Sequence, residues 1–158
     1  MKPTLYLETT IVSYYVARPT DKLIVAAQQE LTRQWWEKRL KDFRVFISQF
    51  VLDESADGEP VMARRRREKL RRFDLLDVND EVMGLGRHLL ATKLFPRGAA
   101  RDASHLSVAA VHGLHFLLTW NCKHLANASV FERVREICRE HGYACPVICT
   151  PHELMERV

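Results

Sequence analysis

The stretch Arg101-Asp102-Ala103-Ser104-His105-Leu106-Ser107-Val108-Ala109-Ala110 is followed closely by Leu114-His115-Phe116-Leu117-Leu118-Thr119-Trp120-Asn121. The first part has the pattern of a helix that opens with an acid, and the second that of a short buried strand ending in polar residues. Ligands of open α/β sheets bind beyond the carboxyl ends of the strands, so both polar ends can share one sheet edge. This stretch therefore predicts both the fold class and the place of a site.

The rest of the chain alternates strand and helix patterns. Short apolar runs predict further strands at 4–7, 44–48, 73–76 and 147–149. Helices are predicted at 11–17, 21–40, 49–54, 79–94 and 128–141, with others starting at Pro60 and Pro151, and a turn at 95–98. Such alternation implies a parallel sheet with helices on both faces.

Some details of these helices are also predicted. Thr9 or Thr10 is expected to cap the first helix and Asp21 the second. The second helix should turn Leu23 and Trp35 inward, and the helix at 79–94 should bury four apolar side chains at helical spacing, namely Val82, Leu85, Leu89 and Leu90.

The length and composition indicate a globular protein. The 158 residues predict a single domain, 1–158, without an internal repeat or boundary. No apolar run approaches the roughly 20 residues of a membrane helix, and no signal peptide is recognised, so we expect a cytoplasmic protein without a membrane partner. The formal net charge of +4 fits an anionic partner.

Three acids are placed to meet at the expected sheet edge. Glu8 follows the first strand, Glu54 lies shortly after the second, and Asp102 opens the central helix, while Asn121 ends the fourth strand. Crowded carboxylates need cations or shared protons, and oxygen ligands suit Mg²⁺ or Mn²⁺. Taken singly, each residue also fits a solvated charge, a helix cap or a turn former.

The ordered set of motifs resembles the PIN-domain family, and within it the VapC-type toxin ribonucleases of toxin–antitoxin pairs. The matching pieces cover almost the whole chain: Leu5-Tyr6-Leu7-Glu8-Thr9-Thr10-Ile11, Ile47-Ser48 with Val51-Leu52-Asp53-Glu54, Asp102-Ala103-Ser104-His105-Leu106-Ser107-Val108-Ala109, and Leu117-Leu118-Thr119-Trp120-Asn121. The resemblance implies a three-layer α/β/α sandwich with a small central parallel sheet. It also implies cleavage of RNA by hydrolysis with Mg²⁺ or Mn²⁺.

The resemblance assigns roles by position. Glu8, Glu54 and Asp102 take the places of metal-binding acids, and Thr119 that of the threonine before the fourth acid. Glu8 replaces an aspartate, and Asn121 replaces the fourth acid. Because asparagine is neutral, we expect one firm metal site and a weaker second one.

Other residues are weaker candidates for contact with a substrate. Thr9 follows the first acid, Trp120 borders Asn121, and basic residues stand before the central helix and in a run along an earlier one (Arg101; Arg64 and Arg65 within the run 64–72). The run fits phosphate contact, an acidic partner or a solvated helix face. His105 lies one turn after Asp102, where it can touch the site or, as we favour, pack as a hydrogen-bonded histidine.

The interpretation that we favour is a Mg²⁺- or Mn²⁺-dependent endoribonuclease with an antitoxin partner, which the resemblance implies together with a homodimer. One alternative, favoured by Asn121, is a catalytically weakened protein that holds RNA or a partner. A second is a DNA-directed nuclease, against which the small size of the chain argues.

Overall fold

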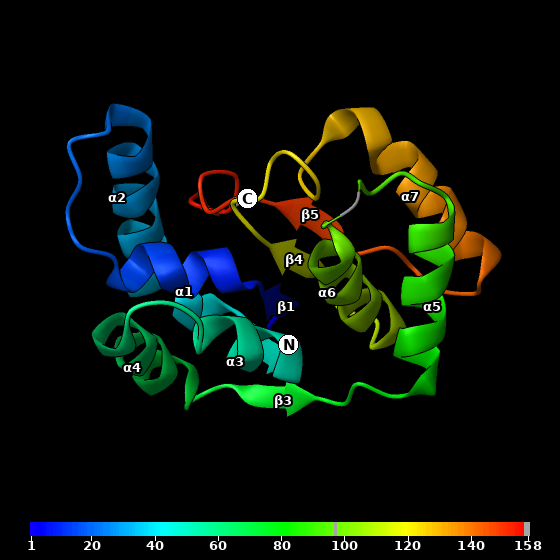
Figure 1. Cartoon of the computed structure of the whole chain (residues 1–158), viewed down its shortest axis with the longest axis horizontal. Helices are drawn as coiled ribbons and strands as arrows, with labels where there is room; N and C mark the ends of the chain where they lie inside the picture. The colour runs from blue at the N-terminus through cyan, green and yellow to red at the C-terminus, as the bar shows by residue number, and fades with distance from the viewer. Residues whose placement is uncertain (97, 157–158) are drawn as a thin grey trace.

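Five strands form one parallel sheet in the computed structural model, which describes residues 1–96 and 98–156. The order across the sheet is β3-β2-β1-β4-β5, so the first strand lies at its centre (Figure 1). The bounds are β1 Thr4–Leu7, β2 Arg44–Ser48, β3 Asp74–Leu76, β4 Phe116–Leu118 and β5 Val147–Cys149. The predicted parallel α/β architecture is confirmed.

Helices connect successive strands and cover both faces of the sheet. Figure 1 shows α1 to α4 grouped on one side and α5 to α7 on the other, the arrangement that right-handed crossovers produce. None of the helices in the described residues has the length and apolarity needed to cross a membrane. Their bounds are α1 Thr9–Val16, α2 Leu23–Lys38, the 3-10 helix η1 Leu40–Asp42, α3 Gln49–Ser55, α4 Pro60–Leu70, α5 Asp80–Ala91, α6 Ala100–Val111 and α7 Ala128–Glu140.

The strand register brings the polar strand ends to one edge. Tyr6 of β1 lies opposite Phe46 of β2 and Leu117 of β4. The ladder continues just past the strands, where the Glu8 amide donates to the Leu118 carbonyl at 3.1 Å. The residue after β1 and the residues after β4 are therefore neighbours, as the sequence predicted.

Two predicted helix starts are wrong. The cap of α1 is neither Thr9 nor Thr10 but Glu8, whose Oε2 accepts from the Thr10 amide at 3.1 Å. Asp21 does not cap α2, which begins after Lys22 without a side-chain cap. As a result, Leu23 stands in the first turn beyond the core with 84% of its surface exposed, rather than inward.

Other predicted details also differ from the structure. Leu90 is 38% exposed because it lies on the outer side of α5, whereas Val82, Leu85 and Leu89 are buried as predicted. Residues 151–154 form turns instead of a terminal helix, with the Glu153 carboxylate accepting from the Thr150 amide at 2.7 Å. Arg97 of the predicted turn lies outside the described residues.

Candidate functional site

Glu8 is a buried carboxylate whose two oxygens have different surroundings. Oε2 accepts from the Thr10 amide at 3.1 Å, the Thr10 hydroxyl at 2.5 Å and the Thr119 hydroxyl at 2.8 Å. Within residues 1–96 and 98–156, Oε1 makes no hydrogen bond. One side of the carboxylate is thus fixed to the protein, and the other is left for a ligand.

The pKa of Glu8 is raised by burial, which disfavours its charged form. The nearby His105 and the three hydrogen bonds from Thr10 and Thr119 act in the opposite direction without cancelling the effect of burial. A cation beside the free oxygen would stabilise the ionised carboxylate in the same way that a positive side chain does.

Glu54 of α3 lies near Glu8 and contacts His105 of α6. Its Oε1 lies 2.5 Å from Nε2 of His105, which is fully buried. One ligand atom from each of Glu8, Glu54 and His105 can be chosen so that all three lie within 4.8 Å of one another. This spacing is small enough for a single metal ion to contact all three side chains.

The other ring nitrogen of His105 contacts a residue of the sheet. Its Nδ1 lies 2.6 Å from the hydroxyl of Tyr6 in β1, and that hydroxyl lies 2.7 Å from Oγ of Ser48 at the end of β2. All three side chains are buried. His105 is therefore packed and hydrogen-bonded, as we favoured, and it touches Glu54 as well.

Asp102 and Asn121 form a direct pair. The Asn121 amide donates to Oδ1 of Asp102 at 2.8 Å, and the Asn121 carbonyl oxygen accepts from the His124 amide at 3.1 Å. Burial raises the pKa of Asp102 and the Glu54 charge adds to this, whereas Asn121, His124 and His105 lower it. Asn121 thus orients Asp102, and its own side-chain oxygen already has a donor.

Thr119 connects Glu8 to the loop that follows β4. Its hydroxyl donates to Glu8 and accepts from the Asn121 amide at 2.9 Å, and its side chain is fully buried. Thr9, by contrast, has a buried hydroxyl without a hydrogen-bond partner among the described residues. The structure therefore brings Thr119 into contact with Glu8, whereas the Thr9 hydroxyl makes no hydrogen bond to an acid among the described residues.

Trp120 packs against helices at the rim of this region. Its indole nitrogen donates to the Thr32 hydroxyl of α2 at 2.6 Å, and its ring lies 6.3 Å from that of Tyr14 in α1. The side chain is half-buried. These contacts explain the position of Trp120 without a nucleotide.

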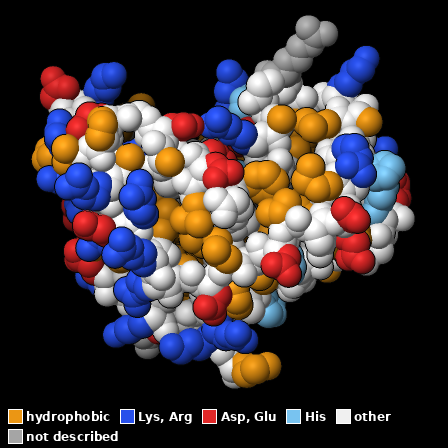
Figure 2. All heavy atoms as spheres, turned by 60° about the horizontal axis from the view of Figure 1, so that its bottom comes forward, with side chains coloured by type: hydrophobic (Ala, Val, Ile, Leu, Met, Phe, Trp, Pro, Cys, Tyr) orange, Lys and Arg blue, Asp and Glu red, His pale blue; other side chains and the backbone are white. Residues whose placement is uncertain are grey.

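The basic candidates lie on the surface at different places. Arg64 and Arg65 are exposed on α4, and Figure 2 shows Lys and Arg side chains gathered on the side of the molecule where α2 and α4 lie. Arg101 is exposed next to Asp102 and pairs with Asp57 at 3.4 Å. Among the basic candidates, Arg101 is therefore the one that directly precedes an acid of the site in the sequence.

Several contributors to this region were missed from the sequence. Tyr6, Ser48 and Thr10 make the hydrogen bonds that hold His105 and Glu8. A tyrosine inside a strand buried on both faces was an available signal, because its hydroxyl needs a partner. Ser48 gave no comparable signal, since its contact depends on the pairing of β1 with β2.

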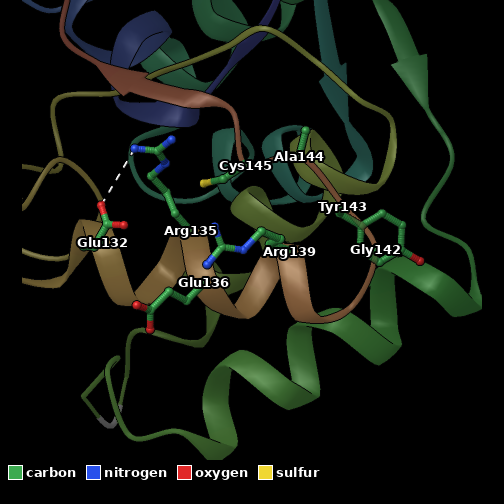
Figure 3. Close-up of a pocket in the computed structure, with 8 residues that line it drawn as sticks. All are labelled: Glu132, Arg135, Glu136, Arg139, Gly142, Tyr143, Ala144 and Cys145. Carbon is green, nitrogen blue, oxygen red and sulfur yellow. Dashed lines mark ion pairs between the residues drawn. The ribbon is translucent and has the colours of Figure 1, made fainter.

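The acids do not line the pocket that is drawn in Figure 3. That pocket lies between the end of α7 and the loop before β5, where Glu132 pairs with Arg135 at 3.7 Å, and its other lining residues are Glu136, Arg139, Gly142, Tyr143, Ala144 and Cys145. It contains no residue that the sequence singled out for chemistry. This pocket therefore lies apart from the candidate site, which is defined by its polar contacts.

Comparison with solved structures identifies the fold. A chain of VapBC2 from Rickettsia felis, crystallised bound to a DNA fragment from their promoter, aligns over 93% of this chain and 98% of its own, with 18% identity and a TM-score of 0.60. A chain of VapBC-1 from nontypeable Haemophilus influenzae aligns over 94% and 98%, with 15% identity and a TM-score of 0.58. No family model and no curated protein matches the sequence.

These likenesses confirm the PIN-like α/β/α sandwich that the sequence motifs predicted. The chain thus has a VapC-like PIN fold, and the alignments span nearly the full length of both structures. At these identities the comparison defines the architecture, so the chemistry has to be argued from the residues of this chain.

Proposed function

We propose that the protein is a Mg²⁺- or Mn²⁺-dependent endoribonuclease and the toxin of a toxin–antitoxin pair. The observation that carries this proposal is the group formed by buried Glu8, partly buried Glu54 and buried His105. The charges of Glu54 and His105 also influence the pKa of nearby Asp102. Acidic side chains gathered at the carboxyl edge of a parallel sheet are suited to divalent cations and to phosphodiester chemistry.

The residues present fit such an ion. Glu8 and Asp102 each keep one carboxylate oxygen without a hydrogen bond among the described residues, and burial makes an ionised carboxylate costly at both. Carboxylate oxygens are the ligands that Mg²⁺ and Mn²⁺ prefer. When bound, the ion would polarise the phosphodiester and lower the pKa of an attacking water.

The acids and the polar side chains beside them have different roles in this proposal. Glu8 and Asp102 would hold the ion, and Glu54 would bind it or accept a proton from the attacking water. Thr119 fixes Glu8 and Asn121 fixes Asp102 through the bonds of 2.8 Å described above. Because water is the nucleophile and the 2′-hydroxyl is not required, the products should carry 5′-phosphate and 3′-hydroxyl ends.

The surroundings supply candidate contacts for the RNA and for a protein partner. The exposed arginines of α4, including Arg64 and Arg65, and Arg101 beside Asp102 can meet phosphates, while Thr9 and Trp120 remain weaker candidates. The structural relatives are VapBC complexes, which supports an antitoxin partner for this chain. We include a homodimer and a cytoplasmic location in the proposal.

A protein that binds RNA or a partner without cutting is the second candidate. It is favoured by the Asn121–Asp102 bond, which occupies one oxygen of Asp102 with a neutral amide where the resemblance leads us to expect an acid. Such a protein would bind RNA or its partner as well in EDTA as in Mn²⁺, and Asn121→Asp would then be the variant expected to gain cleavage.

The test is cleavage of a mixed pool of structured RNA by the purified protein with Mg²⁺, with Mn²⁺ and with EDTA. Asp102→Asn should abolish the cuts, and Asp53→Asn should not, because Asp53 is an exposed acid of α3 that bonds to Gln49 at 2.8 Å. Urea unfolding should show that both variants are folded. Absence of metal-dependent cuts by the wild type would reject the nuclease in favour of the binding protein.

A further inference from the structure

The hydrogen-bond chain behind the acids runs from Ser48 through Tyr6 and His105 to Glu54. Its contacts measure 2.7, 2.6 and 2.5 Å, and Tyr6, Ser48 and His105 are each fully buried. Such a chain fixes the imidazole ring on both sides, so that its Nε2 faces the carboxylates with little freedom to turn away.

Two arrangements of protons are compatible with the contacts among Ser48, Tyr6 and Nδ1 of His105. In the first, the Ser48 hydroxyl donates to Tyr6, the Tyr6 hydroxyl donates to Nδ1, and Nε2–H donates to Glu54. In the second, Nδ1–H donates to the Tyr6 oxygen and the Tyr6 hydroxyl donates to Ser48. The second leaves a bare lone pair on Nε2 that can bind a cation. The Glu54 oxygen would then move away from its present contact with Nε2, because two ligands of one ion stand farther apart than 2.5 Å.

The second arrangement matches the surroundings of metal-binding histidines. Such a histidine donates its other ring N–H to an oxygen acceptor, which fixes the tautomer and the orientation of the ring. Here the Tyr6 oxygen, 2.6 Å from Nδ1, is that acceptor. The change between the two arrangements requires rotation of hydroxyl protons, a change of tautomer and a small movement of the Glu54 carboxylate.

The acids provide a second and independent indication. Glu8 belongs to the same group and is only 3% exposed, and its hydrogen bonds with other described residues are all made by Oε2. One carboxylate oxygen of Glu8, one of Glu54 and a ring nitrogen of His105 lie within 4.8 Å of one another, so the three side chains provide two oxygen donors and one nitrogen donor.

We infer that His105 contributes a nitrogen ligand, through Nε2, to a metal site that it forms with Glu8 and Glu54. The inference deepens the proposed function and rests on its metal site, but not on RNA cleavage. A site with imidazole should prefer Mn²⁺ and later transition metals such as Co²⁺ to Mg²⁺, which favours oxygen ligands. Tyr6 and Ser48 are positioning residues that hold the ring in the required tautomer.

The experiment is pulsed electron paramagnetic resonance of the full chain loaded with Mn²⁺ alone, after labelling its histidines with ¹⁵N. We expect a coupling from one directly bonded nitrogen, which must disappear in His105→Gln. His112→Gln is the matched control, because His112 follows α6 and bonds at the surface to the Asp77 carbonyl at 2.8 Å. It should retain both the coupling and the Mn²⁺ affinity.

Affinity gives a second measurement, which does not depend on whether His105→Gln folds. Tyr6→Phe leaves the His105 imidazole in place but removes the hydroxyl that contacts its Nδ1. We expect this variant to bind Mn²⁺ about 10- to 100-fold more weakly than the wild type. Mg²⁺, competed against Mn²⁺, should bind the wild type more weakly than Mn²⁺ does.

The outcomes separate this inference from the nuclease. Nitrogen coupling in a protein that cuts no RNA would support the inference and reject the nuclease. Cleavage of RNA with Mn²⁺ bound but without nitrogen coupling would overturn the inference, leaving His105 as a support for Glu54. No binding of Mn²⁺ at all would overturn the inference and the proposed metal dependence together.

Discussion

Replacing Thr119 by valine tests whether the acids are held by buried hydrogen bonds. The change keeps the shape of the side chain and removes a hydroxyl that donates to Glu8 at 2.8 Å and accepts from the Asn121 amide at 2.9 Å. A hydrogen bond to a charged group contributes about 1.5–3 kcal/mol, and the amide left without a partner adds about 1 kcal/mol. We therefore expect the free energy of unfolding at pH 7 to fall by about 2.5–4 kcal/mol.

The assay is urea unfolding followed by tryptophan fluorescence in EDTA, where the midpoint should fall and the slope should stay unchanged. Thr150→Val is the matched control, because the Thr150 hydroxyl also bonds to a glutamate, Glu153, at 3.1 Å, but at the surface. It should change the free energy of unfolding by no more than about 0.5 kcal/mol. Equal losses in the two variants would refute the argument that burial strengthens the Thr119 bond.

Three further predictions concern other parts of the chain. Burial raises the pKa of Glu8 above 4.5, the value expected for the unfolded chain. The stability that the protonated Glu8 side chain contributes is therefore fully present below pH 4.5 and is lost as the pH rises through the raised pKa. The free energy of unfolding of Glu8→Gln, relative to wild type in EDTA, should therefore rise with pH between 4 and 8 in urea titrations; a constant difference would contradict this. In α5, a Cβ at Gly86 would lie 3.3 Å from the Ser107 hydroxyl, whereas at Gly84 nothing lies closer than 4.0 Å. Calorimetry should show Gly84→Ala stabilised by about 0.5–1 kcal/mol and Gly86→Ala about 1 kcal/mol less stable than Gly84→Ala. Arg66→Ala removes donors to two carbonyls at the end of α3, at 2.9 and 2.5 Å, and should cost about 1–2 kcal/mol in urea unfolding, a loss that would be absent if water replaced these bonds.

Much of the fold could be predicted because its strands are encoded locally. Runs such as Leu5-Tyr6-Leu7 are apolar on both faces, and the central helix is apolar where it meets the sheet. The ends of helices were harder to predict. Glu8 caps α1 although glutamate is not among the favoured capping residues, because its longer side chain bends back to the Thr10 amide.

The candidate site could be predicted only as a set of residue types at one sheet edge. The positions of Glu8, Glu54, Asp102 and Asn121 follow from strand ends and helix starts, and their roles remain predictions. The part played by His105 depends on Tyr6 from one strand and Ser48 from another. Contacts of this kind arise from packing between distant segments, and no local pattern encodes them.

The sheet ends on both sides in strands of three residues, Asp74–Leu76 and Val147–Cys149. Very short outer strands are one way in which proteins prevent their sheets from joining edge to edge. A partner that added a strand here would gain few backbone hydrogen bonds. A protein that binds this chain tightly must therefore obtain its affinity from side chains on the helical surfaces, where single substitutions can alter which partner is accepted without disturbing the sheet.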